Sequence, residues 1–200
     1  DTSLPVRVNN EGIDNRDIYN VSGKLTYRGD GFTVTSVTSY DTVSEIITGD
    51  AFDFLPINEA YCAQPSDPCF SGSHDLNQSQ YLDVKAFSQE LRFESPANEK
   101  LFWMFGGYLI ATDRFISTGN MLDLGKGVFP VYREPTTNPD NPQYSFLSDQ
   151  QNNFAWAAFA NLGYKFSDLV RIDASLRYDH DRRKNTTETP NAWLGYINFI

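Results

Sequence analysis

The chain has 200 residues, of which 40% are hydrophobic and 14% aromatic, and its formal net charge is −10. This length suffices for one ordinary domain with a core, and the 15 Phe and 11 Tyr favour strands over helices. An acidic chain lacks the basic surface that phosphate binding requires, so we expect no nucleic-acid partner.

The longest apolar run, residues 101–111, is too short for a transmembrane helix, which needs roughly 18 or more apolar residues. A membrane β-barrel is not excluded, because its polar lumen residues dilute every hydropathy window. The chain starts without an initiator Met or a signal peptide, so we expect it to begin inside a longer precursor.

The first predicted elements form a hairpin. Residues 1–17 are polar and irregular, and we expect them to be a loop. Apolar or aromatic residues occupy every second position of residues 19–27, which is the period of a strand. The Gly29-Asp30-Gly31 turn follows, and residues 32 to about 40 predict the returning strand.

A second hairpin is predicted between two long connections. Residues 41 to about 82 carry several acids and no Lys or Arg, which predicts a large acidic loop. Alternation returns in residues 84–94, a turn follows at 95–99, and residues 101–110 predict the returning strand. That strand is apolar on both faces, so its inner face is expected to contact something other than water. Residues 112–151 form the next connection, which four prolines interrupt: Pro130, Pro135, Pro139 and Pro142.

The third hairpin has the clearest pattern. Residues 154–166 and 170–178 place an apolar residue at every second position, and Ser167 and Asp168 form the turn between them. The opposite face carries Arg171 and Asp173 and must meet water or a polar lumen. Strands of about ten residues with aromatic ends are typical of a lipid-facing barrel wall. A connection is predicted at residues 182–190 and a last strand at residues 192–200. The predicted total is about seven strands.

The predicted fold is an all-β antiparallel meander that forms part of a transmembrane outer-membrane β-barrel with long extracellular loops. Its short turns, at residues 29–31, 96–99 and 167–169, should share one end. The structural alternative is a soluble β-sandwich or carbohydrate-binding module, in which a second sheet would cover Leu162, Ile172 and Leu176.

Two segments resemble a known family. FSQELRFESP at residues 87–96, followed by Trp103, Gly106, Gly107 and Tyr108, is similar to a recurrent barrel hairpin of TonB-dependent outer-membrane receptors. AFANLGY at residues 158–164, followed by LRYD at 176–179, resembles the next hairpin of these barrels. The resemblance covers about half of the chain, but no plug or energy-coupling box is recognisable, so residues 1–200 are interpreted as a middle section of one barrel domain.

The resemblance implies a function and partners. It implies active uptake of a scarce nutrient of the siderophore-iron, cobalamin or oligosaccharide class at the bacterial outer membrane. The implied partners are the nutrient, outer-membrane lipid with lipopolysaccharide, and an inner-membrane energy-coupling complex that acts through the plug. A passive porin remains an alternative. We expect neither a cofactor nor enzyme activity, since no nucleophile elbow, phosphate loop or HExxH motif occurs.

Candidate sites lie mainly in the long connections. Cys62 and Cys69 are predicted to form a disulfide, because an exported protein meets an oxidising periplasm, with free thiols or half of a metal site as alternatives. His74 and His180 are each either surface residues or metal ligands. Aromatic residues of the loops that could stack on a ligand ring are Tyr61, Phe70, Tyr81, Phe129, Tyr132 and Tyr144. The loop acids would favour a cationic or neutral ligand, or else bind divalent cations or keep the loop solvated.

Overall fold

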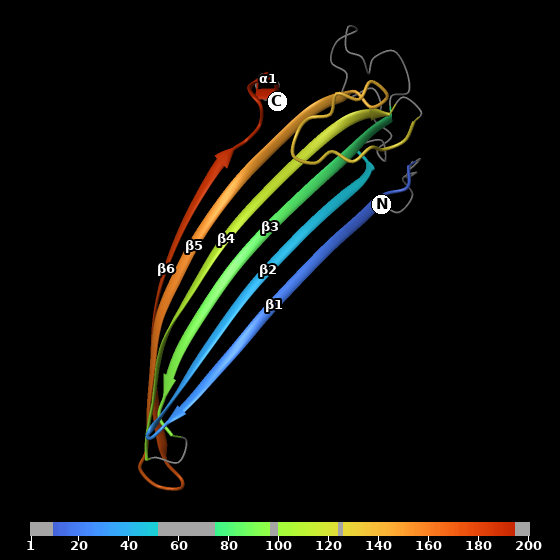
Figure 1. Cartoon of the computed structure of the whole chain (residues 1–200). Coiled ribbons are helices and arrows are strands. Elements are labelled where there is room, and N and C mark those ends of the chain that lie inside the picture. Colours follow the sequence, from blue (N-terminus) through green and yellow to red (C-terminus); the bar gives the residue numbers. More distant parts are fainter. Residues whose placement is uncertain (1–9, 52–74, 97–99, 124–125, 195–200) are drawn as a thin grey trace, which may run out of the picture.

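The computed structural model describes residues 10–51, 75–96, 100–123 and 126–194. Its strands form one antiparallel sheet in the order β1-β2-β3-β4-β5-β6, a single curved layer in Figure 1. The elements are β1 Ile13–Gly29, β2 Phe32–Asp50, β3 Asp75–Glu94, β4 Leu101–Asp123, β5 Gln143–Lys165, β6 Arg171–Thr187 and the short helix α1 Asn191–Leu194. The predicted all-β antiparallel meander is confirmed. No helix of the described ranges is long and apolar enough to span a membrane.

Short turns connect the strands at one end of the sheet, as the sequence predicted (Figure 1). Only Asp30 and Gly31 separate β1 from β2, and Gly31 has a φ of 85°, which a residue without Cβ adopts at little cost. Between β5 and β6, the Phe166 N–H donates to the Val170 carbonyl at 3.0 Å. Of the turn between β3 and β4, residues 97–99 lie outside the described residues.

The strands are much longer than predicted at their other end. The predicted bounds of the loops at residues 1–17, 41–82, 112–151 and 182–190 are wrong, because part of each range belongs to a strand. Beyond the predicted strands, strand structure also includes residues 13–18, 41–50, 75–83, 112–123, 143–153 and 179–187, here called the strand extensions. Backbone hydrogen bonds hold these parts together, while polar side chains on both faces remove the alternation that the prediction used.

The strand predicted at residues 192–200 is also wrong where the structure describes it. Asn191–Leu194 forms α1, and the Trp193 N–H donates to the Pro190 carbonyl at 2.8 Å. Proline has a φ suited to the start of a helical turn, which favours this ending. The described sheet therefore has six strands instead of about seven. Residues 195–200 lie outside the described residues.

The two faces of the sheet differ in chemistry. The register aligns Phe105, Ala160 and Leu176 across β4, β5 and β6, and this side is called the apolar face. Arg171, Asp173 and the residues that share their side form the charged face. On the apolar face Leu162 is 57% exposed, Ile172 59% and Leu176 76%. Within the described ranges no second sheet covers them, so the structure contradicts the β-sandwich alternative.

Large apolar side chains concentrate in a band on the apolar face. This apolar belt comprises the residues that lie on the apolar face within 19–27, 32–40, 87–93, 101–111, 154–164 and 172–178. Its length of about nine to eleven residues on most strands matches the hydrocarbon core of a bilayer. Its few polar side chains satisfy one another, since Gln89 donates to Ser36 at 2.9 Å and accepts from Thr38.

Beyond the belt, the same face is covered by the protein's own chain. Residues 126–142, here called the cover segment, lie against β3, β4 and β5. Ser79 on β3 accepts from the Val131 N–H at 2.8 Å and donates to its carbonyl at 3.2 Å. Met121, Val131 and Phe146 form a buried cluster against which Trp193 packs. This end of the sheet is thus two layers thick.

Candidate functional site on the charged face

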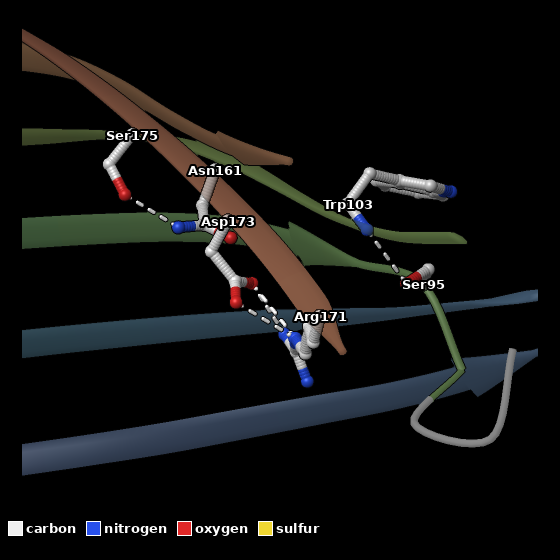
Figure 2. A network of polar contacts seen from close by, with 6 residues as sticks. All are labelled: Ser95, Trp103, Asn161, Arg171, Asp173 and Ser175. Atoms are coloured by element: carbon white, nitrogen blue, oxygen red, sulfur yellow. Dashed lines mark hydrogen bonds and ion pairs between the residues drawn. The ribbon is translucent and has the colours of Figure 1, made fainter. Parts of the chain in front are cut away.

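Ion pairs follow β6 along the charged face. Residues two apart in a strand share a face, so each Arg lies beside an Asp. Arg171 pairs with Asp173 at 2.7 Å, as Figure 2 shows, and Arg177 pairs with Asp179 at 2.7 Å. Arg183 pairs with Asp181 at 2.8 Å at the far end of the strand. The face carries much charge on β6, but its charges balance.

Neighbouring strands extend this polar surface. Asn161 on β5 donates to the Ser175 hydroxyl on β6 at 2.6 Å (Figure 2). On β3, Arg92 pairs with Glu90 and lies 3.7 Å from Glu94. Near the hairpin end the Trp103 N–H donates to Ser95 Oγ at 3.0 Å, which ties β4 to the turn that precedes it (Figure 2).

Arg16 and Glu45 form another pair of the charged face, in the strand extensions of β1 and β2. The Glu45 carboxylate raises the pKa of the Arg16 guanidinium, first by accepting its hydrogen bond and second by Coulomb attraction. The guanidinium is half exposed, and such pairs contribute little to stability because water screens them. We infer that these charges keep the face hydrated more than they hold the sheet together.

Two glycines make room for large side chains on this face. A Cβ at Gly163 would lie 2.3 Å from Asp173 Oδ1, and the Arg171 guanidinium crosses toward the Phe102 ring at 5.4 Å. A Cβ at Gly106 would lie 2.6 Å from the Phe159 ring, so that ring lies over bare backbone. The sequence predicted that the inner face of residues 101–110 contacts something other than water. On the charged face of β4, side chains of β5 and β6 provide part of that contact.

The structure brings two of the predicted aromatic ligand contacts together. Tyr81 and Tyr132 meet edge to face with ring centroids 5.3 Å apart. Tyr81 lies on the apolar face, where it attaches the cover segment to β3, and Tyr132 remains 50% exposed. Phe129 is half-buried within the cover segment. Tyr61, Phe70 and the side chain of Tyr144 lie outside the described residues, so the six are not shown to form one cluster.

The remaining predicted sites are tested only in part. Cys62, Cys69 and His74 lie outside the described residues, and the disulfide stays a prediction. His180 lies on the apolar face, with its ring centroid 6.0 Å from that of Trp156. Across the described ranges, no group of three or more His, Cys, Asp or Glu could hold a metal ion.

Sequence reasoning missed the contacts of Arg133. Its guanidinium pairs with Asp83 and lies 4.3 Å from the centroid of the Phe115 ring. Both partners lie in strand extensions that were expected to be loop or a strand end. No local pattern links residues fifty positions apart, but continuing the strand alternation past residue 84 would have placed Asp83 and Tyr81 on one face.

Comparison with known proteins agrees with this geometry. The family model described as "TonB dependent receptor-like, beta-barrel" matches residues 2–200. Among solved structures, the ferric yersiniabactin uptake receptor FyuA from Yersinia pestis is similar, with a TM-score of 0.55 and 16% sequence identity. The match covers 87% of this chain and 21% of that receptor, so the chain spans about a fifth of its length. At this identity the likeness shows the fold alone.

Proposed function

The chain belongs to the TonB-dependent receptor β-barrel family, and we propose that it forms part of the wall of an outer-membrane receptor that imports a scarce nutrient. Members of this family are transporters, not enzymes. In this proposal the apolar belt faces lipid and the charged face lines the lumen. The strand extensions and the cover segment then lie outside the cell.

The contrast between the two faces of one layer is the observation that carries this proposal. Leu162, Ile172 and Leu176 are more than half exposed in water, which is unfavourable unless lipid covers them. The ion pairs on the opposite face would be costly in hydrocarbon and suit a hydrated lumen. β1 and β6 are the edges of the described sheet, and closure with further strands would satisfy their backbone groups.

The charged face of β4 offers a contact for a domain inside the barrel. Phe102, Met104 and Tyr108 share this face and are only partly covered by β5 and β6. A lumen filled only with water would leave them poorly solvated. We assign them to the contact with the plug, through which an inner-membrane energy-coupling complex would act on the receptor.

Three nutrient classes remain in the proposal: siderophore-bound iron, cobalamin and oligosaccharide. A ferric siderophore is the first to test, because the similar solved receptor takes up ferric yersiniabactin. The half-exposed Tyr132 could stack on a ring of such a ligand, and Arg133 beside it carries a charge already paired with Asp83.

Uptake by cells separates this proposal from its competitors. A strain that lacks the whole gene is compared with wild type on labelled ferric siderophores, cobalamin and oligosaccharides, with and without the energy-coupling complex. We expect one class to lose uptake in both the gene deletion and the coupling deletion. Retained uptake without coupling, together with ungated conductance in planar bilayers, would instead identify a passive porin.

A further inference from the structure

Basic side chains gather on the apolar face directly beyond the apolar belt. The cross-strand register puts one polar row across β2 to β6, consisting of Thr42, Lys85, Asp113, Asn152 and Lys184. The adjoining row toward the belt consists of Tyr40, Phe87, Ala111, Phe154 and Arg182. Lys85, Lys184 and Arg182 therefore lie at the line where the aromatic edge of the belt gives way to polar residues.

These residues line a shallow hollow on the apolar face. Its volume is about 480 Å³, and its lining includes the rings of Tyr40, Phe87 and Phe154 on the side of the belt. The charged residues of the lining are Lys85, Arg182, Lys184 and Asp113. Three basic groups against one acid give the hollow a positive charge, although the chain as a whole has a net charge of −10.

The three basic groups differ from most arginines of the sheet. Arg16, Arg171 and Arg177 each have a carboxylate partner. Within the part of the chain that the structure describes, no ion pair or hydrogen bond engages the side chains of Lys85, Arg182 or Lys184. Asp113, the one acid of the hollow, already accepts a hydrogen bond from Gln150. The hollow thus presents unused positive charge beside an apolar surface.

We propose that this hollow binds the phosphate-bearing headgroup of an outer-leaflet glycolipid of the lipopolysaccharide type. The phosphate lies among Lys85, Arg182 and Lys184, where the arginine fork and the two ammonium groups donate to its oxygens. The acyl chains follow the rings of Phe87 and Phe154 toward the belt. A phosphate joined to acyl chains matches both halves of the hollow, whereas a free anion matches only the basic half. The inference rests on the proposed outer-membrane location.

Lipid binding by the full-length receptor tests this site. The receptor is purified in nonionic detergent, stripped of lipid, and titrated with bisphosphorylated lipid A and with dephosphorylated lipid A, while native mass spectrometry counts bound lipid. The test variant combines Lys85→Glu, Arg182→Glu and Lys184→Glu, and a second variant replaces the same three residues with Gln. Arg114→Glu is the matched control, because Arg114 follows Asp113 in β4 and points to the charged face. Heat-modifiable migration on gels reports whether each variant is folded.

We expect wild type and the Arg114→Glu variant to bind bisphosphorylated lipid A alike. The triple Glu variant should bind it at least roughly tenfold more weakly, with a smaller loss in the Gln variant. The proposal would be overturned if the folded triple variants bound bisphosphorylated lipid A as tightly as wild type does, or if wild type bound dephosphorylated lipid A equally well. Displacement of the bound lipid by millimolar inorganic phosphate would also overturn it. Energised uptake by the wild-type receptor is measured in parallel. Normal uptake by a wild-type receptor that does not bind bisphosphorylated lipid A refutes the lipid site alone, and lipid binding without energised uptake refutes only the transport function.

Discussion

Phe146 and Phe154 lie on the same strand and on the same face, yet Phe146 is 1% exposed and Phe154 is 48% exposed. The cover segment buries the first ring, and no part of the described chain buries the second. Along one sheet face, the strand extensions thus have a second layer from the protein itself, while the described chain leaves the belt uncovered. In the proposed outer-membrane location, the bilayer covers the belt.

The comparison also explains where the protein has a core. The buried apolar residues of the described chain include Met121, Val131 and Phe146, which belong to the extensions and the cover segment. Within the described chain the belt has no such cluster, because no second layer of protein packs against its side chains. Stability in the belt therefore depends on backbone ladders and, in the proposed location, on lipid. Order in the cover segment depends on side-chain packing.

The largest effect is expected from Phe146→Ala. Removing this ring from a packed cluster should cost about 3–5 kcal/mol, mainly in the docking of the cover segment, since ladders to β4 and β6 still hold β5. Hydrogen exchange of residues 126–142 in the full-length receptor should speed up roughly a hundredfold or more. Phe154→Ala is the control and should leave that exchange unchanged. Equal acceleration in belt amides would show that the two regions are one cooperative unit.

Leu176→Arg tests the belt. A charge on the lipid side of a barrel costs about 2–4 kcal/mol near the midplane, so the free energy of unfolding in liposomes should fall by that amount in a denaturant titration. Ser175→Arg, one residue away on the charged face, should cost about 1 kcal/mol or less, through its hydrogen bond with Asn161. Similar losses from both variants would mean that the faces do not meet different surroundings.

In the proposed orientation, the connection between β2 and β3 that contains the predicted Cys62–Cys69 disulfide is extracellular. Closing so short a loop should contribute at most about 2–3 kcal/mol of local order, so reduction should leave the unfolding of the barrel unchanged. Mass spectrometry of the non-reduced protein should find a linked pair. Two freely alkylatable thiols in freshly purified protein would rule the bond out.

Ser79→Ala should have the smallest effect. It removes both hydrogen bonds to the Val131 backbone and leaves a buried donor and acceptor unpaired, at a cost of about 1–3 kcal/mol. Exchange of the Val131 amide should rise accordingly, while Ser22→Ala on the exposed charged face should change nothing in the cover segment. Unchanged exchange at Val131 would show that packing alone docks the segment.

The belt was predictable from sequence, and the extensions were not. Residues 154–164 alternate between an apolar face and a charged face, which in the proposed location meet lipid and water, so the period of two is visible locally. Residues 41–50 mix apolar and polar side chains on both faces, so no period of two is visible and their strand is specified by pairing with β1 and β3, which no local window contains. The pair of Tyr81 with Tyr132 depends on that unseen extension, and so does the basic hollow beside it.

Spin-label accessibility along β5 tests the account most directly. Single cysteines are placed at each of residues 156–162 of the full-length receptor, in a background without other cysteines, and the labelled protein is reconstituted in liposomes. The account predicts a period of two: labels at 156, 158, 160 and 162 collide mainly with oxygen dissolved in lipid, and labels at 157, 159 and 161 collide less with oxygen. A water-soluble nickel reagent should be excluded from the even-numbered labels. Equal access of that reagent to both sets would contradict the assignment of the apolar belt to the bilayer.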